Sequence, residues 1–222
     1  MNNKDRNLLK DLMGESPDVF IDQISQFREL MMMYHCAIRE VTTKLEILND
    51  ELSLKGQKNP IQSIKSRIKT PLSIADKLRR DGKEVSVDSI SENLNDVAGI
   101  RVICPFIDDI YSVADMLIKQ DDVTLVTIKD FIKNPKPNGY RSYHMIVEIP
   151  VFFSDHKQQM RVEIQIRTIA MDFWASLEHS LKYKKDIKNV EQIGKELYEC
   201  AKVISKTDEH MMKIKNMIEM EN

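Results

Sequence analysis

The segment from Met160 to Arg167 alternates apolar and polar residues, which would place four chemically capable side chains on one face of a β-strand. Successive side chains of a strand point to opposite faces. The polar face would carry Arg161, Glu163, Gln165 and Arg167, and the apolar face Met160, Val162, Ile164 and Ile166. A carboxylate among amide and guanidinium groups can accept a proton or bind a cation. A half-exposed strand with a solvated charged face would show the same alternation, so both interpretations stand at this point.

The preceding segment, Ser142 to Ile149, alternates in the same way. Its more polar side would carry Ser142, His144, Ile146 and Glu148. The link from Pro150 to Gln159 is short and polar, which favours an antiparallel hairpin between the two segments. Two adjacent strands would then share a polar face near one end.

A second carboxylate, Asp96, precedes the apolar run from Val97 to Cys104, which Arg101 interrupts. A charged side chain in an apolar run is costly to bury unless it has a partner. Arg101 therefore either pairs with a carboxylate or faces a ligand. Asp96 and Glu163 together would suit Mg²⁺, because this ion takes few protein carboxylates and completes its shell with water and substrate phosphates.

Positive charge gathers in two other segments. Residues Lys65 to Pro71 are rich in Lys and Arg, and Ser73, Lys77 and Arg80 follow at helical spacing on one face. The turn-rich loop from Asn134 to Arg141 holds two cations and an aromatic ring, a composition that suits a stacked base with phosphate nearby. A solvated helix face and a plain connecting loop are the alternatives for the two segments.

The familiar glycine cradles for phosphate are absent from the sequence. It contains neither the Gly-x-x-x-x-Gly-Lys-Ser/Thr loop nor the Gly-x-Gly-x-x-Gly fingerprint. None of the five histidines is followed by Asp, which argues against a metal phosphohydrolase built on a His-Asp pair.

Short apolar or alternating runs predict the strands that would position these residues. They are Val97 to Cys104, Val123 to Ile128, Ser142 to Ile149 and Met160 to Arg167. The amphipathic segment Ile107 to Lys119 predicts a helix between the first two, and this β-α-β start favours their parallel pairing. With the antiparallel hairpin that follows, we expect an α/β (α+β) fold with a mixed sheet flanked by helices.

Long helices are predicted at both ends of the chain. The first would begin at Ser16-Pro17-Asp18 and end between Gly56 and Pro60. Its apolar residues, and those from Ile193 to Ile218, recur at alternating spacings of four and three, as along a helical seam. The two helices would pack together or build an oligomer. We expect an N-terminal helical extension (1–57), a central domain (58–185) and a C-terminal helix for packing or oligomerisation (186–222).

Composition restricts the class of protein. The formal net charge of −2 over 222 residues gives no overall basic field for duplex nucleic acid. Cys36, Cys104 and Cys200 are far apart among apolar neighbours, which predicts reduced, buried thiols. No signal peptide or stretch of about 18 apolar residues is present. We therefore expect a cytoplasmic protein that does not enter a membrane.

Four motifs in order carry a resemblance to a known family. They are Ser66-Arg67-Ile68-Lys69, Asp96-Val97-Ala98-Gly99-Ile100-Arg101, Asn138-Gly139-Tyr140-Arg141-Ser142-Tyr143-His144 and Glu163-Ile164-Gln165-Ile166-Arg167-Thr168. Over residues 58 to 185 the chain resembles the synthetase domain of the RelA/SpoT homologue family, and its length resembles that of a single-domain small alarmone synthetase. The resemblance implies a nucleotidyltransferase-like sheet of about five strands. It also implies transfer of pyrophosphate from ATP to the ribose 3′-hydroxyl of GDP or GTP, which releases AMP and gives ppGpp or pppGpp, and a homotetramer formed through the terminal helices.

The same resemblance implies roles for individual residues. The implied ATP site consists of Arg67, Lys69, Lys77, Arg80 and Arg101. Of these, the arginines Arg67 and Arg101 would sandwich adenine and the others would hold phosphates. The implied GDP or GTP site consists of Lys136, Tyr140, His144, Gln165 and Asp172, with Tyr140 stacked on guanine and with Lys136 and His144 at the phosphates. Asp96 and Glu163 would be the catalytic pair that holds Mg²⁺, and Glu163 would be the base.

Two departures from the family pattern leave the choice between GDP and GTP open: Asp172 stands where some relatives have Asn, and Lys129 where some have Arg. No residues of a hydrolase domain are present, so synthesis without breakdown is expected. A different nucleotidyl or phosphoryl transferase on the same scaffold remains an alternative. A nucleotide- or RNA-binding regulator is the other, although Glu163 and Asp96 argue against it; RNA binding is possible but not predicted.

Overall fold

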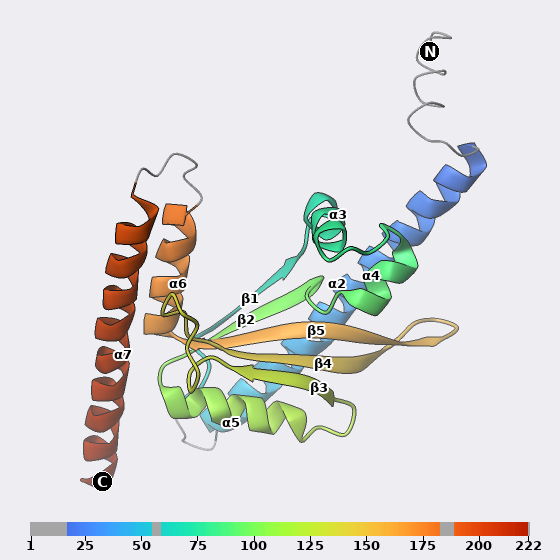
Figure 1. The fold of residues 1–222 in the computed structure, drawn as a ribbon. Coiled ribbons are helices and arrows are strands. Elements are labelled where there is room, and N and C mark those ends of the chain that lie inside the picture. Colours follow the sequence, from blue (N-terminus) through green and yellow to red (C-terminus); the bar gives the residue numbers. More distant parts are fainter. Residues whose placement is uncertain (1–16, 55–58, 183–188, 222) are drawn as a thin grey trace.

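The computed structural model describes residues 17–54, 59–182 and 189–221 (Figure 1). The strands are β1 (Ser63–Ile68), β2 (Ala98–Cys104), β3 (Thr124–Asp130), β4 (Tyr143–Phe152) and β5 (Lys157–Thr168). The helices are α2 (Pro17–Leu54), α3 (Pro71–Arg80), α4 (Val87–Asn93), α5 (Ile107–Ile118), α6 (Ile169–Lys182) and α7 (Val190–Met220). The four predicted strands and the three predicted helices are confirmed, and the residues noted at helical spacing, Ser73, Lys77 and Arg80, lie on α3, whereas β1 and α4 were not predicted as elements. The expected cap Ser16 and the expected breaker Gly56 lie outside the described residues.

The five strands form one mixed sheet in the order β1-β2-β5-β4-β3. Only β2 and β5 pair in parallel, and the other neighbours are antiparallel. The mixed sheet is confirmed, but the expected pairing of β2 with β3 is wrong, because β5 and β4 lie between them. Burial explains the order: β2 is buried along nearly its whole length and needs a neighbour on each side, whereas β3 is largely exposed and forms an edge.

Strands β4 and β5 form the predicted antiparallel hairpin. The hairpin is longer than expected, since Pro150 and Gln159, assigned to the link, pair with each other inside the ladder. The turn takes only residues 153–156, closed by a hydrogen bond of 2.8 Å from the amide of Phe153 to the carbonyl of His156. The polar composition of the link therefore reflects an exposed ladder, not a loop.

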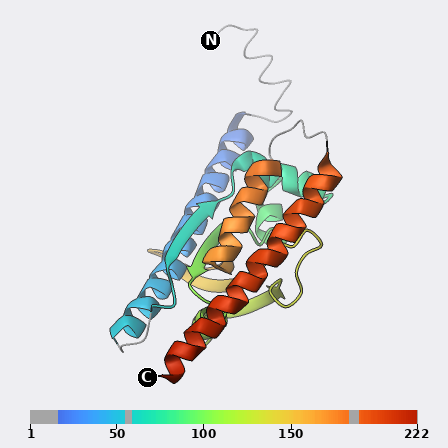
Figure 2. The same ribbon diagram turned by 90° about the vertical axis from the view of Figure 1, so that its left-hand side faces the viewer.

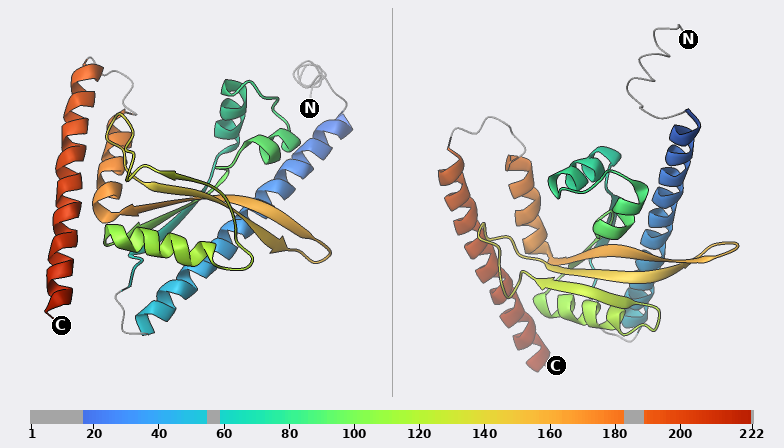
Figure 3. Two further views of the ribbon diagram at one scale, coloured as in Figure 1. Left: turned by 60° about the horizontal axis from the view of Figure 1, so that its bottom comes forward. Right: turned by 45° about the vertical axis from the view of Figure 1, so that its right-hand side comes forward.

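Helices α2 and α5 pack on the apolar face of the sheet, as the left view of Figure 3 shows. Val41 and Leu45 of α2 are fully buried and belong to one hydrophobic cluster with Ile100 of β2 and Ile164 of β5. The apolar seam predicted for the first helix is thus confirmed over its middle part. Its partner is the sheet, because the hydrophobic face of a sheet buries more apolar area than a single helix does.

Helix α7 lies at one end of the sheet, beside α6 and α5 (Figure 2). The indole Nε1 of Trp174 on α6 donates to the carbonyl of Leu197 at 2.9 Å, and Lys215 of α7 pairs with Asp108 of α5 at 2.6 Å. Helix α2 occupies a different side of the molecule from α7 (Figures 1 and 3). The two long helices therefore take different partners within the chain.

The three cysteines differ in exposure. Cys104 is buried as predicted, and burial raises the pKa of its thiol. Cys36 is half-buried and Cys200 is exposed, so the expectation of three buried thiols is wrong. The reason is that Cys200 lies on the side of α7 that no other described element covers. Separately, no helix in the described part of the chain is both long and apolar enough to cross a membrane.

Candidate active site

Residues that pair across the sheet build its polar face. One cross-strand row consists of Lys65, Arg101, Gln165, His144 and Lys129. The neighbouring row consists of Arg67, Gly99, Glu163, Ile146 and Thr127. Directly paired residues share a face of the sheet. The polar face predicted for the last two strands is therefore confirmed, and it extends over all five strands between α3 and α6 (Figure 1).

A cleft of about 340 Å³ opens on this face, and both predicted carboxylates, Asp96 and Glu163, line it. Its wall also contains Lys77 of α3, His144 of β4 and Lys136 of the loop before β4. The cleft thus brings together residues that lie up to 86 positions apart in the sequence, from Lys77 to Glu163.

Asp96 joins two of the cations that surround the cleft. Its carboxylate lies 2.7 Å from the Nζ atom of Lys69 and 2.8 Å from that of Lys77. Thr70 positions Lys77, because its hydroxyl caps the first turn of α3 by accepting from the amide of Ser73. Burial raises the pKa of Asp96, but the hydrogen bonds from both lysines outweigh burial and hold this pKa below its ordinary value. Asp96 is therefore ionised at neutral pH.

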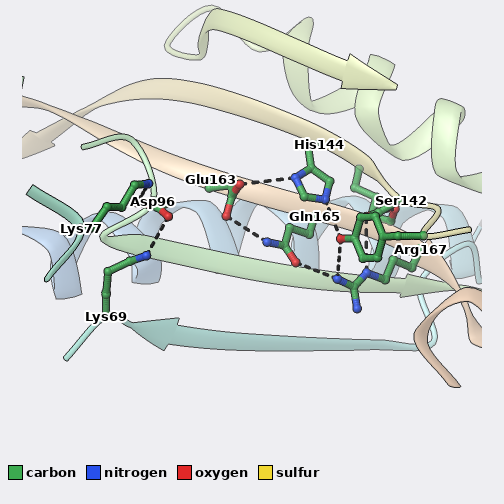
Figure 4. A network of polar contacts seen from close by, with 10 residues as sticks. Lys69, Lys77, Asp96, Ser142, His144, Glu163, Gln165 and Arg167 are labelled. Atoms are coloured by element: carbon green, nitrogen blue, oxygen red, sulfur yellow. Dashed lines mark hydrogen bonds and ion pairs between the residues drawn. The ribbon is translucent and has the colours of Figure 1, made fainter. Parts of the chain in front are cut away.

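Glu163 accepts contacts from both sides (Figure 4). Its Oε2 atom accepts a hydrogen bond of 2.9 Å from the Nε2 atom of Gln165, and its Oε1 atom lies 3.4 Å from the Nδ1 atom of His144. Burial raises the pKa of Glu163, whereas His144 and Gln165 lower it further than burial raises it. The net direction is downward, so this side chain is a carboxylate that can accept a proton or bind a cation.

Arg167, unassigned by the sequence, connects the remaining residues. Its side chain is 5% exposed, and its NH1 atom donates to Asp172 of α6 at 3.0 Å. Its NH2 atom donates to the hydroxyl of Tyr140 at 2.7 Å and to Oε1 of Gln165 at 3.0 Å. The hydroxyl of Tyr140 lies 2.8 Å from Nε2 of His144, which closes a ring of contacts through Glu163.

The loop before β4 is fixed against α7. Gly139 has a positive φ of 87°, a conformation that favours glycine. A Cβ atom at this position would lie 2.5 Å from the Cβ atom of Ala201 on α7. Lys136 in the same loop lies over the rings of Phe131 and Tyr140, at 4.7 and 4.9 Å from their centroids. The loop therefore presents a cation and an aromatic ring side by side.

A second, smaller pocket of about 150 Å³ lies at the β1 side of the face, lined by Arg67, Arg101 and Gln165 among others. Arg101 also lies 3.4 Å from Asp172, so both roles left open for this arginine hold at once: it has a carboxylate partner and it faces a pocket. Burial lowers the pKa of Arg101, and Arg167 lowers it further, while Asp172 raises it.

Arg80 differs from the other predicted residues. Its side chain is 72% exposed, and its described ion-pair partner is the neighbouring Asp81, at 3.6 Å. Phe131, Asn95 and Thr127 line the cleft, although the sequence gave no reason to single them out. Arg167 could have been assigned from the alternation, which already placed it on the same face as Glu163.

The residues present fit a magnesium ion in their chemistry. Asp96 and Glu163 line one cleft as ionised carboxylates, and Asp96 is close enough to raise the pKa of Glu163. Hard oxygen ligands are those that Mg²⁺ prefers, and one or two carboxylates with substrate phosphates are its usual protein site.

Comparisons with known proteins agree with this geometry. Residues 66–188 match the family described as "Region found in RelA / SpoT proteins". The chain is 42% identical to GTP pyrophosphokinase YwaC of Bacillus subtilis (strain 168), over 88% of this chain and 93% of that protein. It is 36% identical to GTP pyrophosphokinase YjbM of the same organism, over 87% and 90% of the two chains.

Solved structures of high similarity include small alarmone synthetase 1 from Bacillus subtilis bound to its product pppGpp. That structure superimposes with a TM-score of 0.79 at 35% identity, covering 87% of this chain and 98% of the other. Small alarmone synthetase 2 from the same organism gives 0.77 at 42% identity, covering 86% and 98%. The chain therefore belongs to the RelA/SpoT family, among its small alarmone synthetases.

Proposed function

We propose that this chain synthesises (p)ppGpp: it transfers pyrophosphate from ATP to the ribose 3′-hydroxyl of GDP or GTP and releases AMP. One observation carries the proposal. The ionised carboxylates Asp96 and Glu163 line a single cleft together with the cations Lys77 and Lys136. The two relatives named above are GTP pyrophosphokinases, and one similar structure contains pppGpp.

The reaction needs a base and stabilised phosphates. The 3′-oxygen of the acceptor attacks the β-phosphorus of ATP, and the bond from this phosphorus to the α,β-bridging oxygen breaks. Glu163 takes the hydroxyl proton, and AMP leaves with the bridging oxygen. ATP and GDP thus give AMP and ppGpp, and ATP and GTP give AMP and pppGpp. Positioning and electrostatic stabilisation dominate such transfers, which explains a cleft built of cations and carboxylates.

On the donor side, Arg67 and Arg101 hold adenine between their guanidinium groups. The small pocket that both line supports this assignment. Lys69, Lys77 and Arg80 bind the ATP phosphates. Lys69 and Lys77 are held in place by Asp96, whereas Arg80 is exposed and must move its long side chain toward the nucleotide.

On the acceptor side, Tyr140 stacks on guanine, and Lys136 and His144 meet the phosphates. The position of Lys136 over the ring of Tyr140 supports a site in which base and phosphate bind next to each other. Gln165 and Asp172 lie beside the guanine. Because the carboxylate of Asp172 is shared with Arg167 and Arg101, its contact to guanine is made by a side chain with fixed orientation.

Asp96 and Glu163 would hold Mg²⁺, which would supply charge neutralisation for the transferred phosphates. Lys69 and Lys77, which pair with Asp96, would lie next to that ion and can turn their amino groups toward the ATP phosphates.

We also propose that the protein is a cytoplasmic homotetramer assembled through its terminal helices. An exposed apolar stripe on α6 supports this assembly, because Phe173 and Leu177 would be costly to leave in water. Further exposed apolar residues, among them Met217 and Ile218, lie on α7.

Product analysis tests the reaction. The purified protein is incubated with Mg²⁺, GDP and ATP labelled in the β- and γ-phosphates, and the products are separated by anion-exchange chromatography. We expect AMP and a guanosine that carries the label in equal amounts. Formation of ADP, or of AMP with free pyrophosphate, would identify a different transferase, and absence of turnover would favour a nucleotide-binding regulator.

A further inference from the structure

In the ring of contacts through Arg167 and Glu163, one end can only donate hydrogen bonds and the other can only accept them. A guanidinium group can only donate hydrogen bonds and a carboxylate can only accept them. Two paths join these ends, one through Gln165 and one through Tyr140 and His144 (Figure 4). The contacts of Arg167 with Tyr140 and Gln165 are therefore donated by Arg167, and the hydrogen bond from Gln165 to Glu163 is accepted by the carboxylate.

These fixed donor and acceptor ends set the orientation of side chains in the ring that could otherwise rotate. Gln165 must present Oε1 to Arg167 and Nε2 to Glu163. The Nδ1 atom of His144 lies 3.4 Å from Oε1 of Glu163, and a hydrogen bond between them is donated by the imidazole, because the carboxylate cannot donate. The Nε2 atom of His144 lies 2.8 Å from the hydroxyl of Tyr140, which accepts from Arg167. A single amide orientation of Gln165 results, and the hydroxyl of Tyr140 is held between Arg167 and His144.

We propose that Arg167 is a positioning residue for pyrophosphate transfer, which acts through both paths to hold Glu163 and the ring of Tyr140 in their reactive places. The proposal rests on the function proposed above. Arg167 does not need to touch either nucleotide, since its side chain is 5% exposed and its guanidinium group donates to protein partners.

The donors of Arg167 are divided between two tasks. Nε and NH1 contact Ser142 and Asp172, which fasten the guanidinium to β4 and α6. NH2 donates to Tyr140 and Gln165, the first members of the two paths to Glu163. An arginine that merely compensated the charge of Asp172 would not need the second set. Lysine cannot replace this fork, because its donors all radiate from one nitrogen.

The test compares Arg167→Lys with Arg161→Lys as a matched control. Arg161 lies on the same face of the same strand and pairs with Glu148 at 3.3 Å, outside the ring. For Arg167→Lys we expect kcat to fall about 100-fold, as for a misplaced reacting group, while KM for ATP changes less than about threefold. KM for GDP rises because Tyr140 is no longer held. Arg161→Lys leaves kcat within about twofold.

A spectroscopic readout separates positioning from mere stabilisation of the fold. The side-chain amide protons of Gln165, observed by nuclear magnetic resonance, should have shifts dispersed from those of a free glutamine in the wild-type protein, because Oε1 accepts from Arg167 and Nε2 donates to Glu163. In Arg167→Lys these shifts should move toward the free values. A variant that unfolds at lower temperature and raises both KM values, yet keeps kcat and the Gln165 shifts, would overturn the proposal and leave Arg167 a structural residue only.

Tyr140→Phe provides a second variant, in case Arg167→Lys does not fold. It keeps an aromatic ring for stacking but removes one of the two paths, so kcat should fall. An unchanged kcat in Tyr140→Phe would contradict the proposal. If the wild-type protein released no AMP with a pyrophosphorylated guanosine, the proposed function would fail, whereas the Gln165 amide shifts would still decide whether Arg167 orders the ring.

Discussion

Gly139 and Ala201 touch across the boundary between the acceptor loop and α7: a Cβ atom added to Gly139 would lie 2.5 Å from the Cβ atom of Ala201. Real Cβ atoms do not approach so closely, so either the loop or the helix would have to move. Because Tyr140 follows Gly139 directly, the position of the C-terminal helix sets the position of the ring proposed to stack on guanine.

Gly139→Ala should therefore raise KM for GDP several-fold and lower the melting temperature, with little change in KM for ATP. Gly82→Ala is the matched control: Gly82 also has a positive φ, of 68°, but an added Cβ would meet nothing within 4 Å. Both variants are destabilised by backbone strain of about 1 kcal/mol, and only Gly139→Ala also brings a Cβ atom into a steric clash with Ala201. Steady-state kinetics and thermal unfolding measure the difference.

A double variant isolates the contact itself. Ala201→Gly removes the atom that the new Cβ would meet, so Gly139→Ala should cost less stability on this background than on the wild type. Equal costs on both backgrounds would show that the Gly139 to Ala201 contact does not restrict the loop.

Glu163→Gln should lower kcat by about 10²- to 10⁴-fold, the usual contribution of a positioned base. The amide keeps the size of the side chain but cannot take the hydroxyl proton, so binding of ATP, measured by calorimetry, should change little. Glu148→Gln is the control, since Glu148 lies on the same polar face and pairs with Arg161. Normal turnover of Glu163→Gln would remove this residue from the mechanism.

The buried carboxyl of Asp208 on α7 should make stability depend on pH. Burial raises its pKa above the ordinary value of 3.8, and its hydrogen bond of 2.6 Å from Thr168 and the charge of Arg141 oppose burial only in part. The folded state thus binds this proton more tightly than the unfolded state does. The stability contributed is complete below the unfolded pKa and is lost as pH rises through the folded pKa.

Asp208→Asn does not titrate at this position. Its free energy of unfolding, relative to wild type, should therefore increase as pH rises from about 4 toward neutrality. Urea denaturation at fixed protein concentration measures this difference. Asp155→Asn should show the opposite trend at lower pH, because His156 lowers the pKa of Asp155: the stability contributed by this carboxylate is present above the ordinary pKa of 3.8 and is lost as the pH falls below it. A relative stability of Asp208→Asn that falls with rising pH would mean that the ionised form is the favoured one in the fold.

The exposed stripe on α6 should hold the oligomer together. Phe173→Glu, at a residue that is 60% exposed, should dissociate the assembly into smaller species in light scattering. Phe152→Glu makes the same substitution at the tip of the β4-β5 hairpin, where Phe152 is 73% exposed, and should leave the mass unchanged. A wild-type protein that is monomeric at micromolar concentration would refute the tetramer.

Local sequence was sufficient for the two long helices, for four of the five strands and for the polar face of β5. The reason is that the period of two in a strand and of 3.6 in a helix follows from backbone geometry alone, whatever the rest of the chain does. Glu163 and Gln165 were placed on the same face as Arg167 on this basis. Motif order then sufficed for the family, which the comparisons confirm.

Tertiary structure alone decided which residues meet. Alternation could not show that β5 lies between β2 and β4, so it could not show that Arg101 pairs across to Gln165 and Gln165 to His144. Nor could it bring Asp172 to Arg167 or Gly139 to Ala201. Strand neighbours and helix docking depend on burial summed over the whole chain, and no local period encodes that sum. The sequence thus identified Glu163 as a candidate base. Only the fold showed that Gln165, His144 and Tyr140 connect Glu163 to Arg167.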